Sequence, residues 1–275
     1  MSNTKQAVAK DTAQPTPPTI SSAAAKILIT GVAGAGKTYT LTTLTDAFVV
    51  YADTKKRFPL DIPHTNVFPF REFRKIKKVN GKTVVTNNVP DKAIEYNGIQ
   101  DFTSQIVNKM LVYNKLKGHL PKTVAFDAIT NIYKMINDYI TTTTKNVYGS
   151  HSADTARDAD IFLAWVEREL IARGINVVFL AHVIVNRESG DLQVATSGSK
   201  TFENTGGFMG VCNYASYVHV NEGARLVANK SNESSTVCRS MLQDVSELEP
   251  VEEFNLQNML EQIREYESQL TNSEI

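Results

Sequence analysis

The stretch Lys26–Thr38, KILITGVAGAGKT, places a short β-favouring run, a glycine-rich turn and the start of a helical pattern in direct succession. Four of its residues fit the pattern G-x-x-x-x-G-K-[ST], which is typical of loops that bind phosphate: Gly31, Gly36, Lys37 and Thr38. Glycines matter here because the loop must wrap its backbone N–H groups around an anion, and side chains would hold the chain away. The stretch therefore predicts a strand over residues 26–30, a phosphate loop, and a helix over residues 37–48.

Two side chains of this loop have distinct chemical roles. Lys37 can reach the β- and γ-phosphates of a nucleoside triphosphate. The Thr38 hydroxyl can bind Mg²⁺ at the start of the helix, where the positive end of the helix dipole faces the phosphates. We therefore expect ATP and Mg²⁺ as cofactors. The residues expected to form the nucleotide-binding loop are Gly31, Val32, Ala33, Gly34, Ala35, Gly36, Lys37, Thr38 and Tyr39.

Length and composition limit the class of protein. The chain has 275 residues, of which 42% are hydrophobic, and this predicts one α/β domain with tails. Cys212 and Cys238 lack a paired spacing, which favours a reducing compartment over a disulfide framework or a zinc site. No apolar run approaches the roughly 18 residues of a membrane-spanning helix, so we expect a soluble, cytoplasmic protein without a membrane partner. Residues 1–24 are rich in Ser, Thr, Pro and Ala and predict a disordered leader, so that the core begins at residue 25 and extends to 243.

Three further apolar runs end at polar residues, as buried strands of a parallel sheet can do. These runs are FVVYA before Asp53, TVAF before Asp127 and INVVFLA before His182. An apolar strand closed by Asp127 downstream of a phosphate loop is typical of the second NTPase motif, whose carboxylate holds Mg²⁺ opposite Thr38. Other periodic segments predict helices over 99–115, 129–148 and 155–173, and strands over 214–220 and 224–228. Together they predict a three-layer α/β fold with a mostly parallel central sheet flanked by helices.

Residues 55–97 form a predicted insertion in this fold. Asn80-Gly81 lies between two β-favouring runs and indicates a hairpin. The ribbon is basic and has Phe68, Phe70 and Phe73 nearby, so it is a candidate for binding single-stranded DNA; an exposed hairpin whose lysines protect its edge remains the alternative. Its proposed DNA-binding residues are Arg74, Lys75, Lys77 and Lys78.

Charge divides the chain into a basic body and an acidic tail. Residues 244–275 contain nine acids and one base, so the tail has a net charge of about −8 and the preceding residues about +8. An apolar stripe at helical spacing also predicts an amphipathic helix in the tail: Phe254, Leu256, Met259, Leu260, Ile263, Tyr266 and Leu270. The tail either competes with DNA for the basic body or acts as a docking helix for the body, another subunit or a partner protein.

With these strand ends in place, residues 26–230 resemble the RecA-like P-loop ATPases, and most of all the phage-encoded, Sak-type ATP-binding proteins implicated in single-strand annealing and recombination. FDAIT, residues 126–130, resembles the family's second motif. FLAHV, residues 179–183, resembles the strand whose terminal polar residue senses the γ-phosphate, which implies that role for His182. The family places a water-activating glutamate after the second strand, whereas this chain offers Asp53 there.

The resemblance also implies roles for the region after residue 184. ENTGG and NYAS, within residues 203–216, resemble the end of a DNA-contacting loop and the strand that follows, which assigns Lys200 and Phe202 to single-stranded DNA. RLVANK, residues 225–230, resembles the strand whose lysine reaches the nucleotide of a neighbouring subunit, so Lys230 is the candidate for that contact.

The resulting expectation is a homo-oligomeric, Mg²⁺-dependent ATPase that binds single-stranded DNA, located in the host cytoplasm if it is phage-encoded. Its implied catalytic residues are Lys37, Asp53, His182 and Lys230, with Thr38 and Asp127 at the metal. A nucleotide-gated assembly protein without a DNA function and a P-loop small-molecule kinase are the alternatives. The sequence leaves open ATP against GTP, ring against filament, DNA preference and the identity of the water-activating acid.

Overall fold

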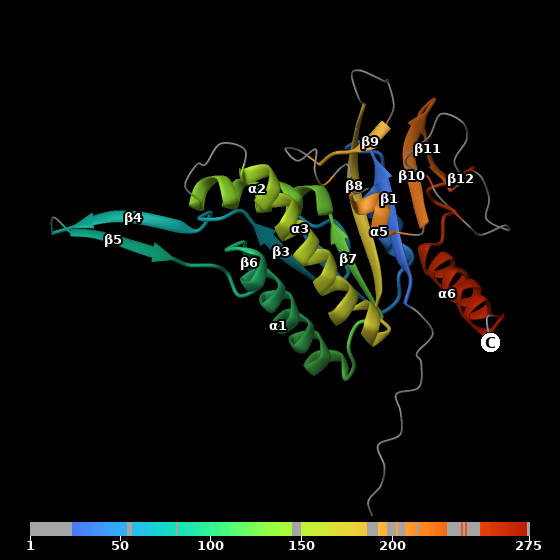
Figure 1. Cartoon of the computed structure of the whole chain (residues 1–275), viewed down its shortest axis with the longest axis horizontal. Coiled ribbons are helices and arrows are strands. Elements are labelled where there is room, and N and C mark those ends of the chain that lie inside the picture. Colours follow the sequence, from blue (N-terminus) through green and yellow to red (C-terminus); the bar gives the residue numbers. More distant parts are fainter. Residues whose placement is uncertain are drawn as a thin grey trace, which may run out of the picture.

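A ten-stranded, mostly parallel sheet forms the centre of the protein (Figure 1). The computed structural model describes residues 24–53, 57–80, 82–144, 150–185, 192–196, 202, 207–212, 214–229, 238, 240 and 248–273. The strands of the sheet path, in spatial order, are β12 (Leu248–Pro250), β11 (Ala224–Ala228), β10 (Tyr214–Asn221), β1 (Lys26–Gly31), β8 (Asn176–Val185), β7 (Thr123–Asp127), β2 (Ala47–Tyr51), β3 (His64–Phe68) and β6 (Ala93–Glu95). From β10 to β6 all neighbours are parallel, whereas β11 and β12 are antiparallel additions at one edge and β9 (Leu192–Val194) pairs with β8.

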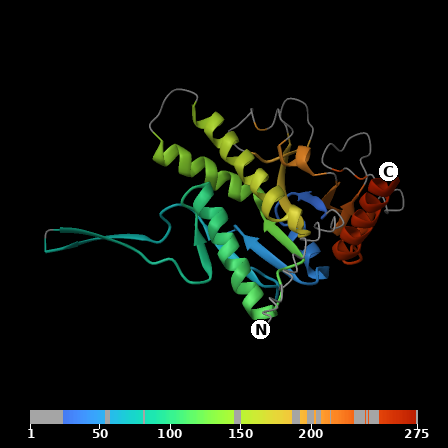
Figure 2. The ribbon, with the colours of Figure 1, turned by 60° about the horizontal axis from the view of Figure 1, so that its bottom comes forward.

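Helices cover both faces of the sheet, because its strands alternate apolar side chains between two cores. On β1, Leu28 contributes to one core, whereas Ile27 and Ile29 contribute to the other. The first core is covered by three long helices, α1 (Ile99–Lys117), α2 (Ile129–Thr143) and α3 (Ser150–Glu169). Two short helices also contribute to it: η2 (Ile171–Arg173), directly after α3, and α5 (Gly207–Val211), later in the chain. The second core is covered by the 3-10 helix η1 (Lys37–Thr43) and by α6 (Leu256–Ser273). The predicted three-layer α/β fold is confirmed, and Figure 2 shows α6 apart from the other helices.

The helix after the phosphate loop is shorter than predicted. Instead of a helix over 37–48, the chain forms the seven-residue η1 and enters β2 at Ala47. Threonine hydroxyls explain the tight winding, since Thr40 donates to the Lys37 carbonyl (2.6 Å) and Thr42 to that of Tyr39 (2.8 Å). Such local side-chain bonds compete with the α-helical ladder, and β-branched residues are also poor helix formers.

The C-terminal stripe packs onto the body. Phe254, Leu256, Leu260 and Ile263 are buried in the second core, and the Leu256 N–H donates to Thr43 Oγ1 (2.9 Å) at the end of η1. This placement agrees with the docking of the helix onto its own body. Residues 1–23, which hold almost all of the predicted leader, lie outside the described residues.

The predicted hairpin is present as a two-stranded arm, which we define as β4 (Arg74–Val79), β5 (Lys82–Asn87) and their connection. It is inserted between β3 and β6 and projects from that edge of the sheet (Figure 1). Among the described residues, no helix is long and apolar enough to cross a membrane.

Candidate nucleotide-binding site

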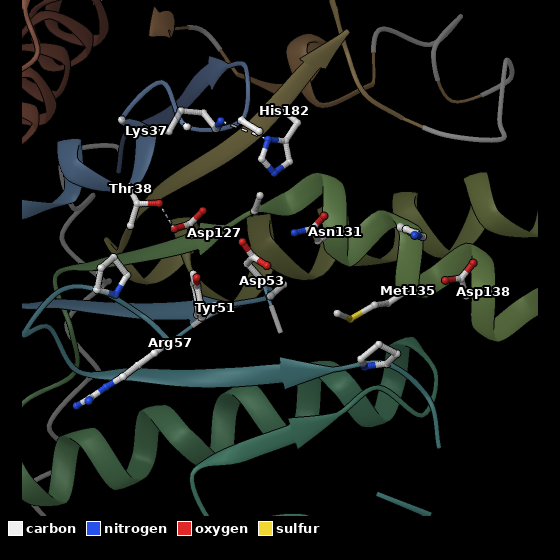
Figure 3. Close-up of a pocket in the computed structure, with 18 of the residues that line it drawn as sticks. Lys37, Thr38, Tyr51, Asp53, Arg57, Asp127, Asn131, Met135, Asp138 and His182 are labelled. Carbon is white, nitrogen blue, oxygen red and sulfur yellow. Dashed lines mark hydrogen bonds between the residues drawn. The ribbon is translucent and has the colours of Figure 1, made fainter. Parts of the chain in front are cut away.

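A cavity of about 580 Å³ opens at the carboxyl ends of the parallel strands (Figure 3). Ligands of open α/β sheets bind at this edge, because loops and helix starts converge there. β8 lies between the phosphate-loop strand β1 and the Asp127 strand β7, so His182, Gly31 and Asp127 come from three neighbouring strands. The sheet order therefore brings the three predicted strand ends together.

The phosphate loop requires glycine for reasons of space and of backbone conformation. A Cβ atom on Gly31 would lie 2.3 Å from the Val218 carbonyl oxygen of β10, a distance that no side chain tolerates. Gly36 has a φ of 106°, which L side chains rarely adopt, and its ideal Cβ position lies 3.3 Å from Arg225 Cδ. Both glycines of the motif are thus dictated by this fold.

Lys37 is buried beneath the cavity with its ammonium held by the loop itself. Its Nζ atom donates to the carbonyl oxygens of Gly31 (2.9 Å) and Val32 (2.8 Å) and lies 3.3 Å from His182 Nδ1. The side chain is 5% exposed and lines the cavity. A buried cation beside an open cavity and a glycine loop suits an anionic ligand such as a triphosphate.

Thr38 and Asp127 meet at the predicted metal position. The Thr38 hydroxyl donates to Asp127 Oδ2 (2.7 Å), as the dashed line in Figure 3 marks. Burial raises the pKa of Asp127, and Asp53 raises it further, whereas the Thr38 hydrogen bond and Lys37 lower it. Magnesium is held in such sites by one or two carboxylates together with substrate phosphates and water, so this pair fits Mg²⁺ bound with a nucleotide.

Asp53 and Tyr51 border the cavity at the end of β2. Burial, followed by the charges of Asp53 and Asp127, raises the pKa of Tyr51 to about 12. The phenol therefore stays protonated at neutral pH and can act as a hydrogen-bond donor there. His182 lies across the cavity, and its backbone N–H donates to Thr130 Oγ1 (3.3 Å) on α2.

Sequence reasoning missed several residues that line the same cavity: Arg57, Asn131, Lys134, Met135, Asp138 and Arg225. Four of them follow one stripe of α2, and Figure 3 shows Asn131, Met135 and Asp138 along that helix. The signal for this stripe was the spacing of 131, 134, 135 and 138 directly after the Asp127 strand. Arg225 had no local signal, because β11 reaches the loop only through its antiparallel pairing with β10.

Other predicted residues lie elsewhere. The expectation that Phe202 offers its ring to a base is wrong: the side chain is 1% exposed and its ring stacks on Tyr133 with centroids 5.1 Å apart. Aromatic burial in the first core outweighs the polar character of the surrounding sequence. Ala35 is buried in the second core, and Tyr39 is exposed outside the cavity. Lys200 and Lys230 lie outside the described residues.

The sheet order, the phosphate loop and the Thr38–Asp127 pair define a P-loop NTPase of the α/β class. The sequence matches the model of a protein family described as an AAA domain over residues 23–239. The chain therefore belongs to this AAA-domain family. No curated protein gives a match to the chain.

Proposed function

We propose that the protein is a Mg²⁺-dependent ATPase that acts with single-stranded DNA in recombination or annealing, as the resemblance to Sak-type proteins implies. The observation that carries the ATPase part is the convergence of Lys37, Thr38 and Asp127 on one cavity. The DNA part is supported by the likeness of residues 203–216 to a DNA-contacting loop. Homo-oligomerisation, with Lys230 reaching a neighbouring nucleotide, belongs to the same proposal.

The residues of the cavity have separate roles in the proposed hydrolysis. Backbone N–H groups of the loop and Lys37 bind the β- and γ-phosphates, and Thr38 with Asp127 holds Mg²⁺. Bound Mg²⁺ supplies neutralisation of the charge that develops on the phosphate oxygens. Asp53 accepts a proton from the attacking water, while Tyr51 donates a hydrogen bond at the same end of the cavity. His182, next to Lys37 Nζ, responds to the presence of the terminal phosphate.

One observation favours a second candidate, the P-loop small-molecule kinase. The cavity continues beyond Asp127 along α2, where Asn131, Lys134 and Asp138 offer an amide and charges of both signs. Such a polar extension suits a second small substrate placed to receive the phosphoryl group.

The deciding experiment measures ATP turnover with and without single-stranded DNA, using Asp127→Asn to define background. Stimulation by DNA supports the proposal. Turnover that DNA leaves unchanged but that a small hydroxyl- or phosphate-bearing substrate induces, with stoichiometric phosphorylation of that substrate, supports the kinase instead. Absence of turnover under all these conditions contradicts both enzyme functions.

A further inference from the structure

The arm has a strong charge that the chain does not neutralise. Residues 74–87 contain five bases and no acid, and both strands are exposed along their length. Within the described part of the chain, no salt bridge includes an arm base. Six-residue strands extend about 20 Å, so the arm reaches well beyond the surface of the body. Its charges can therefore meet an external surface.

The root of the arm is fixed by one buried carboxylate. Glu95 on β6 is 2% exposed, and its Oε1 accepts from the Phe73 N–H (3.0 Å) while its Oε2 accepts from Asn87 Nδ2 (2.7 Å). Phe73 directly precedes β4 and Asn87 ends β5, so Glu95 ties both strands to the sheet. A hairpin that served only as a loose connection would have no need of this double hydrogen bond.

The faces of the arm favour a protein partner over a nucleic acid. Ile76 is paired with Val85 on one face, and Val79 and Val84 lie on the other; they are 62%, 47%, 50% and 41% exposed, respectively. Bases on both faces surround these apolar side chains. The aromatic rings that could stack on bases are engaged at the root instead, since Phe68 packs on Phe73 and Phe70 on Tyr139. Basic and apolar side chains together fit an acidic protein surface.

An acidic surface of the same chain lies at the opposite edge of the sheet. Residues 248–273 contain six acids and one base. Because α6 turns its apolar stripe inward, Glu261 and Glu265 lie on its exposed side, and Glu252 and Glu253 are exposed just before it. The sheet order separates β6, at the arm, from β12 by the full width of the sheet, about 40 Å for nine strands. Figures 1 and 2 both place the arm and α6 at opposite ends of the molecule, so the arm cannot reach α6 of its own chain.

We propose that the arm docks on the acidic outer side of α6 in a second copy of the chain, so that copies assemble head to tail. Complementary charges at opposite ends make this contact heterologous, and such contacts generate a ring or an open filament. The exposed Leu248 on the edge strand β12 offers an apolar contact near the acidic surface. This interface specifies how the proposed homo-oligomer is held together, and it does not depend on ATP hydrolysis or on DNA binding.

Charge exchange tests the interface. Sedimentation velocity of the full chain, with and without Mg-ATP and at low and high salt, should show an assembly that weakens as salt rises. The arm variant Lys75→Glu/Lys77→Glu and the helix variant Glu261→Lys/Glu265→Lys should each lower the association constant at least about tenfold, because the net charge of the arm falls from +5 to +1 and that of residues 248–273 from −5 to −1, which removes most of the charge complementarity. An equimolar mixture of the two variants, or both pairs combined in one chain, should restore assembly, because opposite charges then meet again.

The matched control is Lys115→Glu/Lys117→Glu, which reverses two exposed lysines at the end of α1. It should leave assembly unchanged, and thermal unfolding should confirm that every variant is folded. A parent chain that stays monomeric under all conditions would overturn the interface. Failure of the combined variant to reassemble would also overturn it. Unchanged assembly together with lost single-strand binding in the arm variant would assign the arm to DNA instead.

Discussion

The phosphate loop and the arm differ in whether their charged side chains have partners within the chain. At the loop, the Lys37 ammonium is held by two backbone carbonyls and Asp127 accepts from Thr38, so each charged group has a partner within the chain. On the arm, the bases are exposed and none joins a salt bridge within the described residues. The loop is therefore preorganised for a ligand, whereas the charge of the arm suits a surface outside its own chain.

The largest difference between the two regions should appear in stability. Leu260, buried on α6, shares a core with Ala35 and Leu41 of the loop and its helix. Leu260→Ala should lower the free energy of unfolding by about 2–5 kcal/mol, whereas Ile76→Ala on the arm should lower it by less than about 0.5 kcal/mol. Urea unfolding measures both. Equal losses for the two variants would mean that the arm is part of the core.

The affinity for ATP should depend on the lysine of the phosphate loop and not on the cavity lysine of α2. Lys37→Ala removes a buried cation from the loop and should weaken ATP binding roughly 100-fold, since hydrogen bonds to a charged group contribute up to about 3 kcal/mol. Lys134→Ala, which removes a second cavity lysine on α2, serves as the matched control and should change ATP affinity little. Calorimetry that finds the two variants equally affected would move the phosphate site toward α2.

A substitution at the root of the arm should destabilise the arm without affecting the phosphate-loop strand. Glu95→Gln keeps the size of the side chain but replaces a charged acceptor with a neutral amide, so the hydrogen bonds to Phe73 and Asn87 are weakened at a cost of about 1–2 kcal/mol. Amide hydrogen exchange should accelerate in β4 and β5 and remain unchanged in β1. Equal acceleration in β1 would show that the arm is not an independent unit.

The smallest expected change in stability is that caused by replacing Asp127. Its pKa is raised in the folded chain, so the native state binds more protons than the unfolded state, and stability falls as pH rises from the unfolded value of about 3.8 through the raised folded value. Without Mg²⁺ at pH 7, Asp127→Asn should therefore raise Tm, because the neutral amide avoids the burial of a charge at this position. The difference should shrink as pH falls through that window. A lower Tm for the variant at pH 7 would contradict the raised pKa.

The sequence predicted well where a feature depends on neighbouring residues. The glycines and Lys37 of the loop, the strands before Asp127 and His182, and the Asn80-Gly81 hairpin all follow from patterns within about ten residues. The sequence predicted that the sheet is mostly parallel, but it did not predict the order of the strands.

Features that depend on distant segments were not predicted. Arg225 enters the cavity through strand pairing, and Phe202 is buried because Tyr133 and Phe208 surround it. The short η1 could be predicted only in part. Its threonines are evident in the sequence, but its contact with α6 is not. Tertiary contacts override local propensity at each of these positions.

The contact between η1 and α6 affects when the nucleotide site can fold during protein synthesis. Thr43 and Leu256 are joined by a hydrogen bond across 213 residues, and Ile263 is buried about two turns further along α6. The ribosome makes the phosphate loop first and makes the helix that supports it more than 200 residues later. Because domains fold as the chain emerges, a nascent chain displays the loop long before its support exists. The nucleotide site therefore matures late, after the strands between β2 and β11 have been synthesised.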